Sequence, residues 1–593
     1  MLLHPRVSLS LALALAPACG DSGQAATQDT DVGSTGGSTG PVPGSTGGST
    51  EPGTSEGGET TAAPPTTGGE SSTGPVCPED APPAAPTVLE PVEGRIDVIA
   101  AQLQIKGSPF SDPDVGDVLG GGEAEIWKMK DGVADERVWS ATFSGDAPPT
   151  LTLADGSFDA GPDETLGEWK DYAVRLRYRD EHGACSSFGP WSADLVFRTD
   201  DGSTMLFDDS VVRDIYIDIP PASWDAINAE ALPPGCVPYE RNYYTGTLRI
   251  DGQTFPGVGV KTKGGCGTSR NLNQKASFKI NLEWDDPDVV GCPGPRRVYG
   301  QNHFTLNNGV QDQSATHERL GYSLYRDLGI PSPRAANVRV FVNDQLWGLY
   351  LNVETLDRRF LSRWFDSNEG MLYEGTYWCD LIPQNLPPND DDDSKCLTRE
   401  FSPGPCSMPS PDGDPLDYST LRTFVEAIQA LPPGGFYPAI EEIFDFDTYL
   451  STWALESIIG HWDGYQFDIK NNYRVYHDPT TQRFTLMSTG IDQTFKKNQD
   501  PWAVQGVLAA RCIQEPACEA AFAERLAAVN DLFAEDDLAG RADAIYQQVS
   551  PFVMEDPRKE YNFQTFQNEH NGLLGFIQNR PAQISGALMS HGF

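Results

Sequence analysis

Three polar residues in the C-terminal third of the chain have the types and spacing that phosphoryl transfer requires. Asp463 follows an apolar segment with helical periodicity, Asn472 opens a stretch that alternates like a strand, and Asp492 follows a second alternating stretch. Phosphoryl transfer needs one carboxylate to accept the proton of a hydroxyl, and a carboxylate plus an amide oxygen to hold Mg²⁺. The three residues are therefore candidates for such a site.

The elements around these residues are predicted to bring them together. Apolar residues recur at spacings of three and four over 446–459, which predicts an amphipathic helix that ends before Asp463. The stretches 473–476 and 484–487 alternate around the turn 478–481, which predicts a β-hairpin between Asn472 and Asp492. The two ends of a hairpin lie side by side, so the three polar groups can converge. The alternative is that these residues only cap helices and begin turns.

A second stretch, 256–282, concentrates positive charge. It holds five basic residues and no acid: Lys261, Lys263, Arg270, Lys275 and Lys279. Side chains alternate along strands, so Lys261 and Lys263 share one face of a first strand, and Lys275 and Lys279 share one face of a second. The glycine-rich tip 264–269 can bring backbone amides close to an anion. The hairpin is a candidate triphosphate cradle, and the alternative is a solvated hairpin with surface lysines.

Length and charge limit the classes of function. At 593 residues the chain is too long for one core, so two or more domains are expected. The net charge of −43, from 42 basic and 85 acidic residues, argues against nucleic acid and against an anionic membrane surface as partners. The acidity is instead expected to keep an exported protein soluble.

The N-terminus predicts export. Residues 1–18 resemble a bacterial signal peptide, and the small residues before Cys19 resemble a lipoprotein processing site, so a lipidated Cys19 would be the only membrane attachment. Plain secretion with an unmodified Cys19 is the alternative. Residues 19–76 consist mostly of Gly, Ser, Thr and Pro, which predicts a disordered tether that holds the rest of the chain off the membrane.

The cysteines suit an oxidising compartment. Without Cys19, ten remain, enough for five disulfides. The expected pairs are Cys77–Cys185, Cys512–Cys518, and pairings within the set Cys236, Cys266, Cys292, Cys379, Cys396 and Cys406. A zinc site is the rival interpretation, but no CxxC pair occurs and the eight histidines are scattered.

Residues 77–200 are predicted to form an all-β sandwich. The stretches 99–105, 124–127, 139–143 and 172–178 alternate between turn residues. The end of this region resembles the last two strands of a fibronectin type III domain, with Tyr172 as its corner tyrosine. Asp112, Asp114 and Asp117 could hold Ca²⁺, or could simply form an acidic turn.

Residues 205–593 are predicted to form one large domain. It contains a helix over 314–328, which begins near a possible Ser314 cap and carries Glu318 and Arg319, and a hairpin from 337 to 353. The order of cationic hairpin, helix, hairpin, helix and acidic loop resembles the two-lobed arrangement of protein kinases, although none of their sequence signatures occurs. Residues 367–418, with the run Asp390–Asp393, are predicted to be a disulfide-pinned surface insertion that could bind Ca²⁺ or substrate. The tail from 506 onward is predicted to be helical.

Four stretches of this region together resemble the spore-coat CotH kinase family. They are the cationic segments 259–264 and 275–280, the segment from Leu306-Asn307-Asn308 to 334, the stretch 347–354, and 461–495. The resemblance implies an α+β, atypical protein-kinase fold that uses ATP and Mg²⁺ or Mn²⁺ to phosphorylate Ser/Thr of secreted or surface proteins.

The resemblance also implies roles for single residues. Asp463 matches the family's catalytic Asp, while Asn472 and Asp492 match the positions expected to hold the metal. Lys263, Lys275 and Lys279 match its basic hairpin, and they are expected, with Glu318 and Arg319, to bind the nucleotide.

One position departs from the family pattern. Gly490 stands where the family has an acid, so metal binding and activity are in question here. The family also includes adhesion proteins, so a catalytically inactive surface-binding protein is the rival function.

Overall fold

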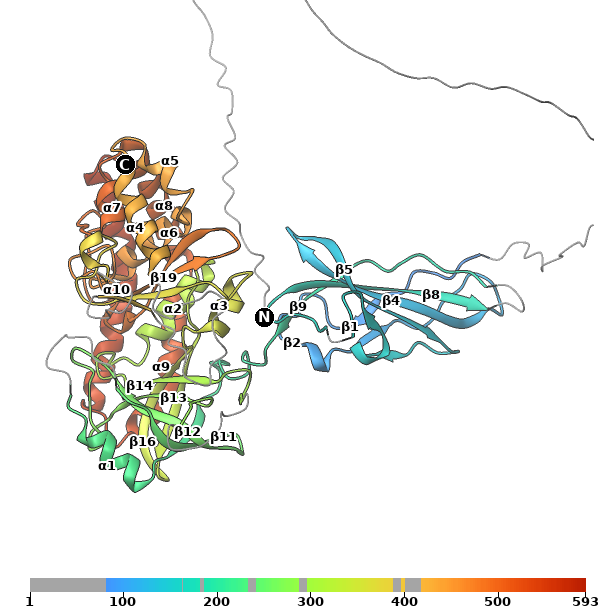
Figure 1. Cartoon of the computed structure of the whole chain (residues 1–593), viewed down its shortest axis with the longest axis horizontal. Coiled ribbons are helices and arrows are strands. Elements are labelled where there is room, and N and C mark those ends of the chain that lie inside the picture. Colours follow the sequence, from blue (N-terminus) through green and yellow to red (C-terminus); the bar gives the residue numbers. More distant parts are fainter. Residues whose placement is uncertain are drawn as a thin grey trace, which may run out of the picture. The chain divides into compact units, whose positions relative to one another are not determined.

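The computed structural model describes residues 81–593 except 163, 182–185, 233–240, 287–295, 388–395 and 400–417. The predicted signal peptide, Cys19, the tether 19–76, the Cys77–Cys185 bridge and the run Asp390–Asp393 lie outside the described residues. Within them the fold is mixed α+β, as predicted (Figure 1).

Two β-sheets form the first part of the described chain. The larger has the strand order β2-β9-β8-β4-β5-β7 and the smaller β1-β3-β6. Their bounds are β1 (Val88–Glu90), β2 (Val98–Ile99), β3 (Ile105–Gly107), β4 (Val118–Lys130), β5 (Val133–Ser144), β6 (Thr150–Leu151), β7 (Ser157–Phe158), β8 (Asp171–Glu181) and β9 (Leu195–Asp200). Both sheets contribute to one hydrophobic core that includes Ile105, Ile126 and Trp139. The hydroxyl of Tyr172 accepts a hydrogen bond from the Gly167 amide at 2.9 Å, the contact expected of a corner tyrosine.

This region differs from prediction in one strand and contains the predicted acidic cluster. The predicted strand over 99–105 is wrong, because a 3₁₀ turn (Ala100–Gln102) separates β2 from β3. Asp112, Asp114 and Asp117 each offer an oxygen within 4.8 Å of the others. However, Asp112 and Asp114 already accept backbone hydrogen bonds, from Asp114 and Ala81 respectively, both at 2.7 Å. The calcium site therefore stays a prediction.

A closed β-barrel follows, with the strand order β10-β11-β12-β13-β14-β16-β15. Its strands are β10 (Arg213–Asp218), β11 (Tyr244–Ile250), β12 (Gln253–Lys263), β13 (Ser277–Asn281), β14 (His303–Asn307), β15 (Ala335–Val342) and β16 (Gln345–Val353). The barrel also packs against α1 (Pro221–Ala229) and has its own core, which includes Val260, Phe278 and Ile280.

The cationic stretch forms the predicted hairpin within this barrel. β12 and β13 pair antiparallel, with Lys261 opposite Lys279 and Lys263 opposite Ser277. Because Phe278 and Ile280 fill the barrel core, the lysines of these strands lie on its outer face. Lys275 lies before β13 begins, so strand alternation does not carry it onto that face.

Most of the remaining helices share another large core with a four-stranded sheet. The short helix Arg358–Trp364 instead packs on part of that sheet in a smaller cluster, which includes Phe360, Leu372 and Met487. The sheet has the order β18-β17-β19-β20, with β17 (Leu372–Gly375), β18 (Leu397–Arg399), β19 (Tyr473–Asp478) and β20 (Arg483–Ser488). The helices are α2 (His317–Asp327), α3 (Arg358–Trp364), α4 (Ser419–Ala430), α5 (Phe436–Ile440), α6 (Phe446–Ile459), α7 (Val507–Cys512), α8 (Pro516–Glu535), α9 (Leu538–Glu555) and α10 (Phe563–Ser590).

Helix α6 has the predicted bounds but a different environment. It was expected to be amphipathic, yet it is buried on nearly every side. It packs against both α8 and β20, and its Trp453 stacks on Phe522 of α8 with ring centroids 3.4 Å apart. A helix covered from two sides cannot keep a polar face in water. Its buried polar residues must therefore find partners inside the protein.

Helix α2 begins later than predicted. Ser314 is not its cap: the helix starts at His317, and Asp312 accepts a hydrogen bond from the His317 amide at 2.8 Å. The predicted helical tail is confirmed by α7 to α10, although Leu532, expected in its apolar stripe, is 48% exposed.

Two disulfides lie within the described residues. The predicted Cys512–Cys518 bridge is confirmed, and Cys379 pairs with Cys396 from the predicted set. No helix among the described residues is long and apolar enough to cross a membrane.

Candidate active site

The structure brings Asp463, Asn472 and Asp492 to one place. Gly460 ends α6 in the left-handed conformation and turns the chain into the loop that carries Asp463. Asn472, itself at φ +56°, precedes β19, and its amide Nδ2 donates a hydrogen bond to Asp463 Oδ2 at 2.9 Å. Asp492 follows β20 in a 3₁₀ turn (Ile491–Gln493). The loop after α6 therefore positions Asp463, and the two ends of the β19–β20 hairpin position Asn472 and Asp492 close to it.

Asp492 lies in a strongly acidic environment. Burial, followed by the negative charges of Asp463 and Asp312, raises the pKa of Asp492 to about 7, while Lys263 opposes this shift. Asp312 is committed locally, because its oxygens accept hydrogen bonds from the Ser314 hydroxyl and the His317 amide. A carboxylate held near others without a cation is costly to ionise, which is the electrostatic condition for a cation site.

The side chain of Asn307 links Lys263 to Glu318, close to Asp492. Lys263, the last residue of β12, donates from Nζ to Asn307 Oδ1. Asn307 in turn donates from Nδ2 to both carboxylate oxygens of Glu318, each at 3.0 Å. The end of β12, the end of β14 and the start of α2 therefore join in one hydrogen-bonded chain.

The pKa values of this pair reflect their burial and shared neighbours. Burial and then the positive charge of Lys279 lower the pKa of Lys263 to about 8. Burial and then the charge of Asp492 raise the pKa of Glu318 to about 8, although Asn307 opposes this. Lys279 and Asp492 thus lie close enough to act on the pair.

Two predicted nucleotide-binding residues lie outside this cluster. Lys275 is buried, and its Nζ lies 2.6 Å from Asp556 Oδ2 and 2.7 Å from the carbonyl oxygen of Leu349. Arg319 donates to the Asp209 carbonyl at 2.6 Å and to the Asn337 side chain at 3.1 Å. Both side chains join barrel and helical elements, and the structure does not bring them to Asp463.

The glycine-rich tip of the cationic hairpin approaches the acidic loop through Tyr377. Gly264 and Gly267 adopt φ values of +115° and +80°, which permit the tight turn. Tyr377 hydrogen-bonds the backbone of Cys266 and the side chain of Asn471, and burial together with the charges of Asp463 and Asp492 raises its pKa. The tip therefore borders the same space as the acids.

Gly490 leaves room for Asn472. It sits at φ +59°, and a Cβ at this position would lie 2.4 Å from Asn472 Oδ1. The Gly490 amide donates to the hydroxyl of Tyr322 on α2 at 3.2 Å. An acid at this position would displace the Asn472 amide, so the present position of Asn472 depends on the glycine.

The donor set fits a hard divalent cation. Asp492 supplies a carboxylate in an environment that disfavours its ionisation without a counter-charge. Asn472 could add its amide oxygen, which here accepts a hydrogen bond from Asn471 Nδ2 at 3.1 Å. Oxygen donors of this kind suit Mg²⁺ or Mn²⁺ rather than zinc. Asp463 Oδ1 is buried and has no hydrogen-bond partner among the described residues.

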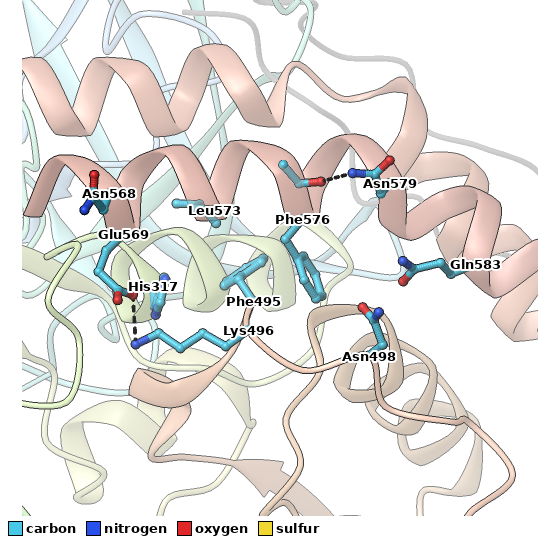
Figure 2. A pocket seen from close by; sticks show the side chains of 12 residues that line it. His317, Phe495, Lys496, Asn498, Asn568, Glu569, Leu573, Phe576, Asn579 and Gln583 are labelled. Carbon is cyan, nitrogen blue, oxygen red and sulfur yellow. Dashed lines mark hydrogen bonds and ion pairs between the residues drawn. The ribbon is translucent and has the colours of Figure 1, made fainter. Parts of the chain in front are cut away.

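A hollow of about 440 Å³ lies between α10 and the segment that follows Asp492 (Figure 2). His317, Phe495 and Lys496 line it, and Lys496 pairs with Glu569 of α10 at 3.1 Å. His317 Nδ1 also lies 3.0 Å from the carbonyl oxygen of Asp492, so the hollow adjoins the acidic cluster. No residue of the predicted site lines this hollow.

Some residues of the cluster were not predicted as site residues. Asn307 and Tyr322 lie in or near recognised motifs, but only the fold shows that their side chains turn toward Glu318 and Gly490. Asp312 precedes α2, where an acid ordinarily signals a helix cap. A search for asparagines at strand ends could have singled out Asn307.

Comparison with known proteins shows the family. A profile of the CotH kinase protein family matches residues 260–584, more than half of the chain, so the chain belongs to that family. The matched region includes every residue of the cluster described above.

Its relatives come from bacteria and fungi. Inner spore coat protein H of Bacillus subtilis (strain 168) is 23% identical over 310 residues, which cover 50% of this chain and 80% of that protein. Invasin CotH2 of Rhizopus delemar is 25% identical over 375 residues, covering 56% of this chain and 58% of the invasin. Invasin CotH3 of the same fungus is 24% identical over 220 residues, which cover 35% of this chain and 33% of that invasin.

Proposed function

We propose that this chain is an extracytoplasmic atypical protein kinase that transfers the γ-phosphoryl group of ATP to Ser/Thr hydroxyls. One observation carries the proposal: the hydrogen-bonded pair Asp463–Asn472 and the bridged pair Lys263–Glu318 flank the same residue, Asp492. Protein kinases use a base, a metal-binding acid and amide, and a lysine–glutamate pair in these roles.

The proposed mechanism relies on position and charge. Asp463 accepts the proton of the acceptor hydroxyl, and Asn472 holds the carboxylate in place through its Oδ2 oxygen. Lys263 and Lys279 offset the charge of the phosphates. Glu318, acting through Asn307, keeps the Lys263 ammonium in place.

Asp492 and Asn472 would hold the metal. A bound Mg²⁺ or Mn²⁺ would neutralise charge on the phosphate oxygens. The layout supports a two-lobed arrangement, in which the barrel carries Lys263 and the helical core carries Asp463.

We place the protein outside the cytoplasm. Relatives named as a spore-coat protein and as invasins favour an extracellular or surface location. The signal-like N-terminus and Cys19 favour export as a lipoprotein, and the disulfides favour an oxidising compartment. The proposed partner is an exported protein that serves as the phosphate acceptor.

The second candidate function is surface binding without turnover. Gly490 favours it, because one acid of the family pattern is missing, and so do relatives named invasins. In that case the cluster could still bind nucleotide, or could be a remnant of a catalytic ancestor.

Transfer of labelled phosphate from ATP distinguishes the two functions. The purified chain, supplied with Mg²⁺ or Mn²⁺, should label itself or a generic Ser/Thr substrate, and Asp463→Asn should lower the rate by about 10²–10⁴-fold. Asp468→Asn is the matched control, since it removes an exposed carboxylate from the same loop. Equal labelling by wild type and Asp463→Asn would refute the kinase proposal.

Thermal shift with ATP–Mg²⁺ then addresses the second function. A ligand at 100 times its Kd stabilises the folded state by about 2.7 kcal/mol. A shift without labelling would indicate a nucleotide-binding protein that has lost turnover, and no shift would favour adhesion alone.

A further inference from the structure

A buried polar cluster lies behind Asp463, and the proposed transfer step leaves it without a role. Its centre is Glu456, in the last turn of α6, which is fully buried. Glu456 Oε1 accepts a hydrogen bond from the Ser488 hydroxyl at 2.5 Å, and Oε2 accepts one from Gln466 Nε2 at 2.6 Å. A buried carboxylate held by two donors has a fixed orientation.

His461 lies between this carboxylate and Asp463. Its Nδ1 is 3.3 Å from Glu456 Oε1, and its Nε2 is 3.6 Å from Asp463 Oδ1. Both His461 Nε2 and Asp463 Oδ1 are buried and have no hydrogen-bond partner within the described part of the chain. The two unpartnered atoms face each other, while Asn472 holds the other oxygen of Asp463.

The surroundings favour a charged imidazole. A neutral ring with its hydrogen on Nδ1, toward Glu456, would present a lone pair to the Asp463 carboxylate, whereas a protonated ring donates on both sides. Burial lowers the pKa of His461, but Glu456 and, more weakly, Asp463 and Asp492 raise it, and the net shift is upward. Tyr325 of α2 also lies close to Glu456, whose charge acts on its hydroxyl.

We propose that Glu456 and His461 form a positioning pair for Asp463. Glu456 holds the imidazole, and the imidazole Nε2–H fixes Asp463 Oδ1 while Asn472 fixes Oδ2. The carboxylate is then held at both oxygens with lone pairs left for the acceptor hydroxyl. The catalytic consequence rests on the proposed function, but the pairing itself is a property of the folded chain.

The transfer step keeps the His461 proton in place. The acceptor oxygen forms a bond to the γ-phosphorus while the bond to the bridging oxygen breaks, and that electron pair leaves on ADP. The hydroxyl proton moves to Asp463, and His461 stays protonated between the two carboxylates. Loss of the His461 proton at high pH would release Asp463 Oδ1 and lower the rate.

The pairing can be tested without any activity. The pKa of His461 is measured by NMR, with the signal assigned by its loss in His461→Asn. Because an opposite charge at this distance shifts a pKa by about one to three units, Asp463→Asn should lower the pKa of His461 by about one unit or more. Asp468→Asn, the control, should leave it unchanged. The proposal is overturned by a His461 pKa that is the same in wild type and Asp463→Asn.

The pH profile of transfer then tests the consequence. Glu456→Gln should move the alkaline limb of kcat to lower pH, because the imidazole loses its charged partner. Lys263 also loses its proton in the alkaline range. Glu456→Gln does not change Lys263, so a shift of the alkaline limb in this variant would be due to His461. A rate lowered equally at every pH would mean a structural role and would overturn the positioning role.

The two proposals fail in different ways. If the wild type transfers no phosphate, the proposed function fails, and the NMR coupling still decides whether the pair exists. If the wild type is active and Asp463→Asn leaves the pKa of His461 unchanged, the positioning pair fails while the kinase stands. Should Glu456→Gln not fold, the Asp463→Asn titration alone decides the pairing.

Discussion

Asp492→Asn is the substitution that separates a metal site from a structural turn. In the metal-free protein the pKa of Asp492 is raised from 3.8 to about 7 by burial and by Asp463 and Asp312. The folded state therefore holds this proton more tightly than the unfolded chain does. The free energy of unfolding should fall as pH rises from about 4 to about 7, because in that range only the folded state still binds the proton.

The magnitude follows from the size of the shift. Each pKa unit corresponds to about 1.36 kcal/mol, so ionising Asp492 at pH 8 costs the folded state up to about 4 kcal/mol. Asparagine removes the charge and keeps the shape, so metal-free Asp492→Asn should be more stable than wild type at pH 8, by about 1–4 kcal/mol. Below pH 4 the difference should vanish, since both side chains are then neutral.

Nucleotide should offset most or all of the stability advantage of Asp492→Asn. At 100 times its Kd, ATP–Mg²⁺ should stabilise the wild type by about 2.7 kcal/mol, and Asp492→Asn should lose this response. Melting scans of both proteins at pH 4 and pH 8, with and without ATP–Mg²⁺, measure all of these differences, and Asp468→Asn serves as the surface control. If Asp492 were only a cap, the substitution would cost about 1 kcal/mol at pH 8 with or without nucleotide. That result would refute the metal-site reasoning.

Three further substitutions test other parts of the site. Glu318→Gln should stabilise the nucleotide-free protein at pH 9. Because the pKa of Glu318 is raised, the wild type loses stability as pH rises from about 4.5 through about 8, and denaturant unfolding at pH 5 and pH 9 measures this loss. Asp556→Asn should destabilise the protein by about 3–5 kcal/mol, because it leaves Lys275 buried without its charged partner, yet it should preserve the response of the melting temperature to ATP–Mg²⁺. Gly490→Ala should lower the free energy of unfolding by about 1–2 kcal/mol, because alanine disfavours the left-handed backbone at this position. It should also displace Asn472 and weaken nucleotide binding, and an unchanged affinity in calorimetric titration with ATP–Mg²⁺ would refute this reasoning.

Local patterns predicted the elements that carry the acids. The bounds of α6 and the hairpin of β19 and β20 follow from apolar spacing over 446–487. The hairpin places Asn472 opposite Thr489, three residues before Asp492. The same patterns could not show that α6 is buried on nearly every side, because α8, which covers it, lies some sixty residues further along the chain.

Lys275 and Arg319 lie away from the acidic cluster for two different physical reasons. Strand alternation predicts Lys275 on the same face as Lys279, but β13 begins only at Ser277. Lys275 is buried instead, because it pairs with Asp556, nearly three hundred residues further along the chain. The family resemblance predicts that both Glu318 and Arg319 bind the nucleotide, yet adjacent helical residues point about 100° apart. Glu318 consequently faces Asn307 while Arg319 faces Asp209.

The charge pattern of the cluster bears on whether Gly490 marks a lost activity. Asp492 and Glu318 lie close to Lys263, and Asp463 lies close to Asp492, in a chain whose net charge is already −43. The raised pKa values of Asp492 and Glu318 mean that their ionisation opposes folding at neutral pH when no cation is bound. A surface protein that only needed the fold would gain stability by losing one of these acids. Their presence together with the Asn472 amide, which occupies the space that Gly490 leaves open, favours a site still organised for a cation and a phosphate.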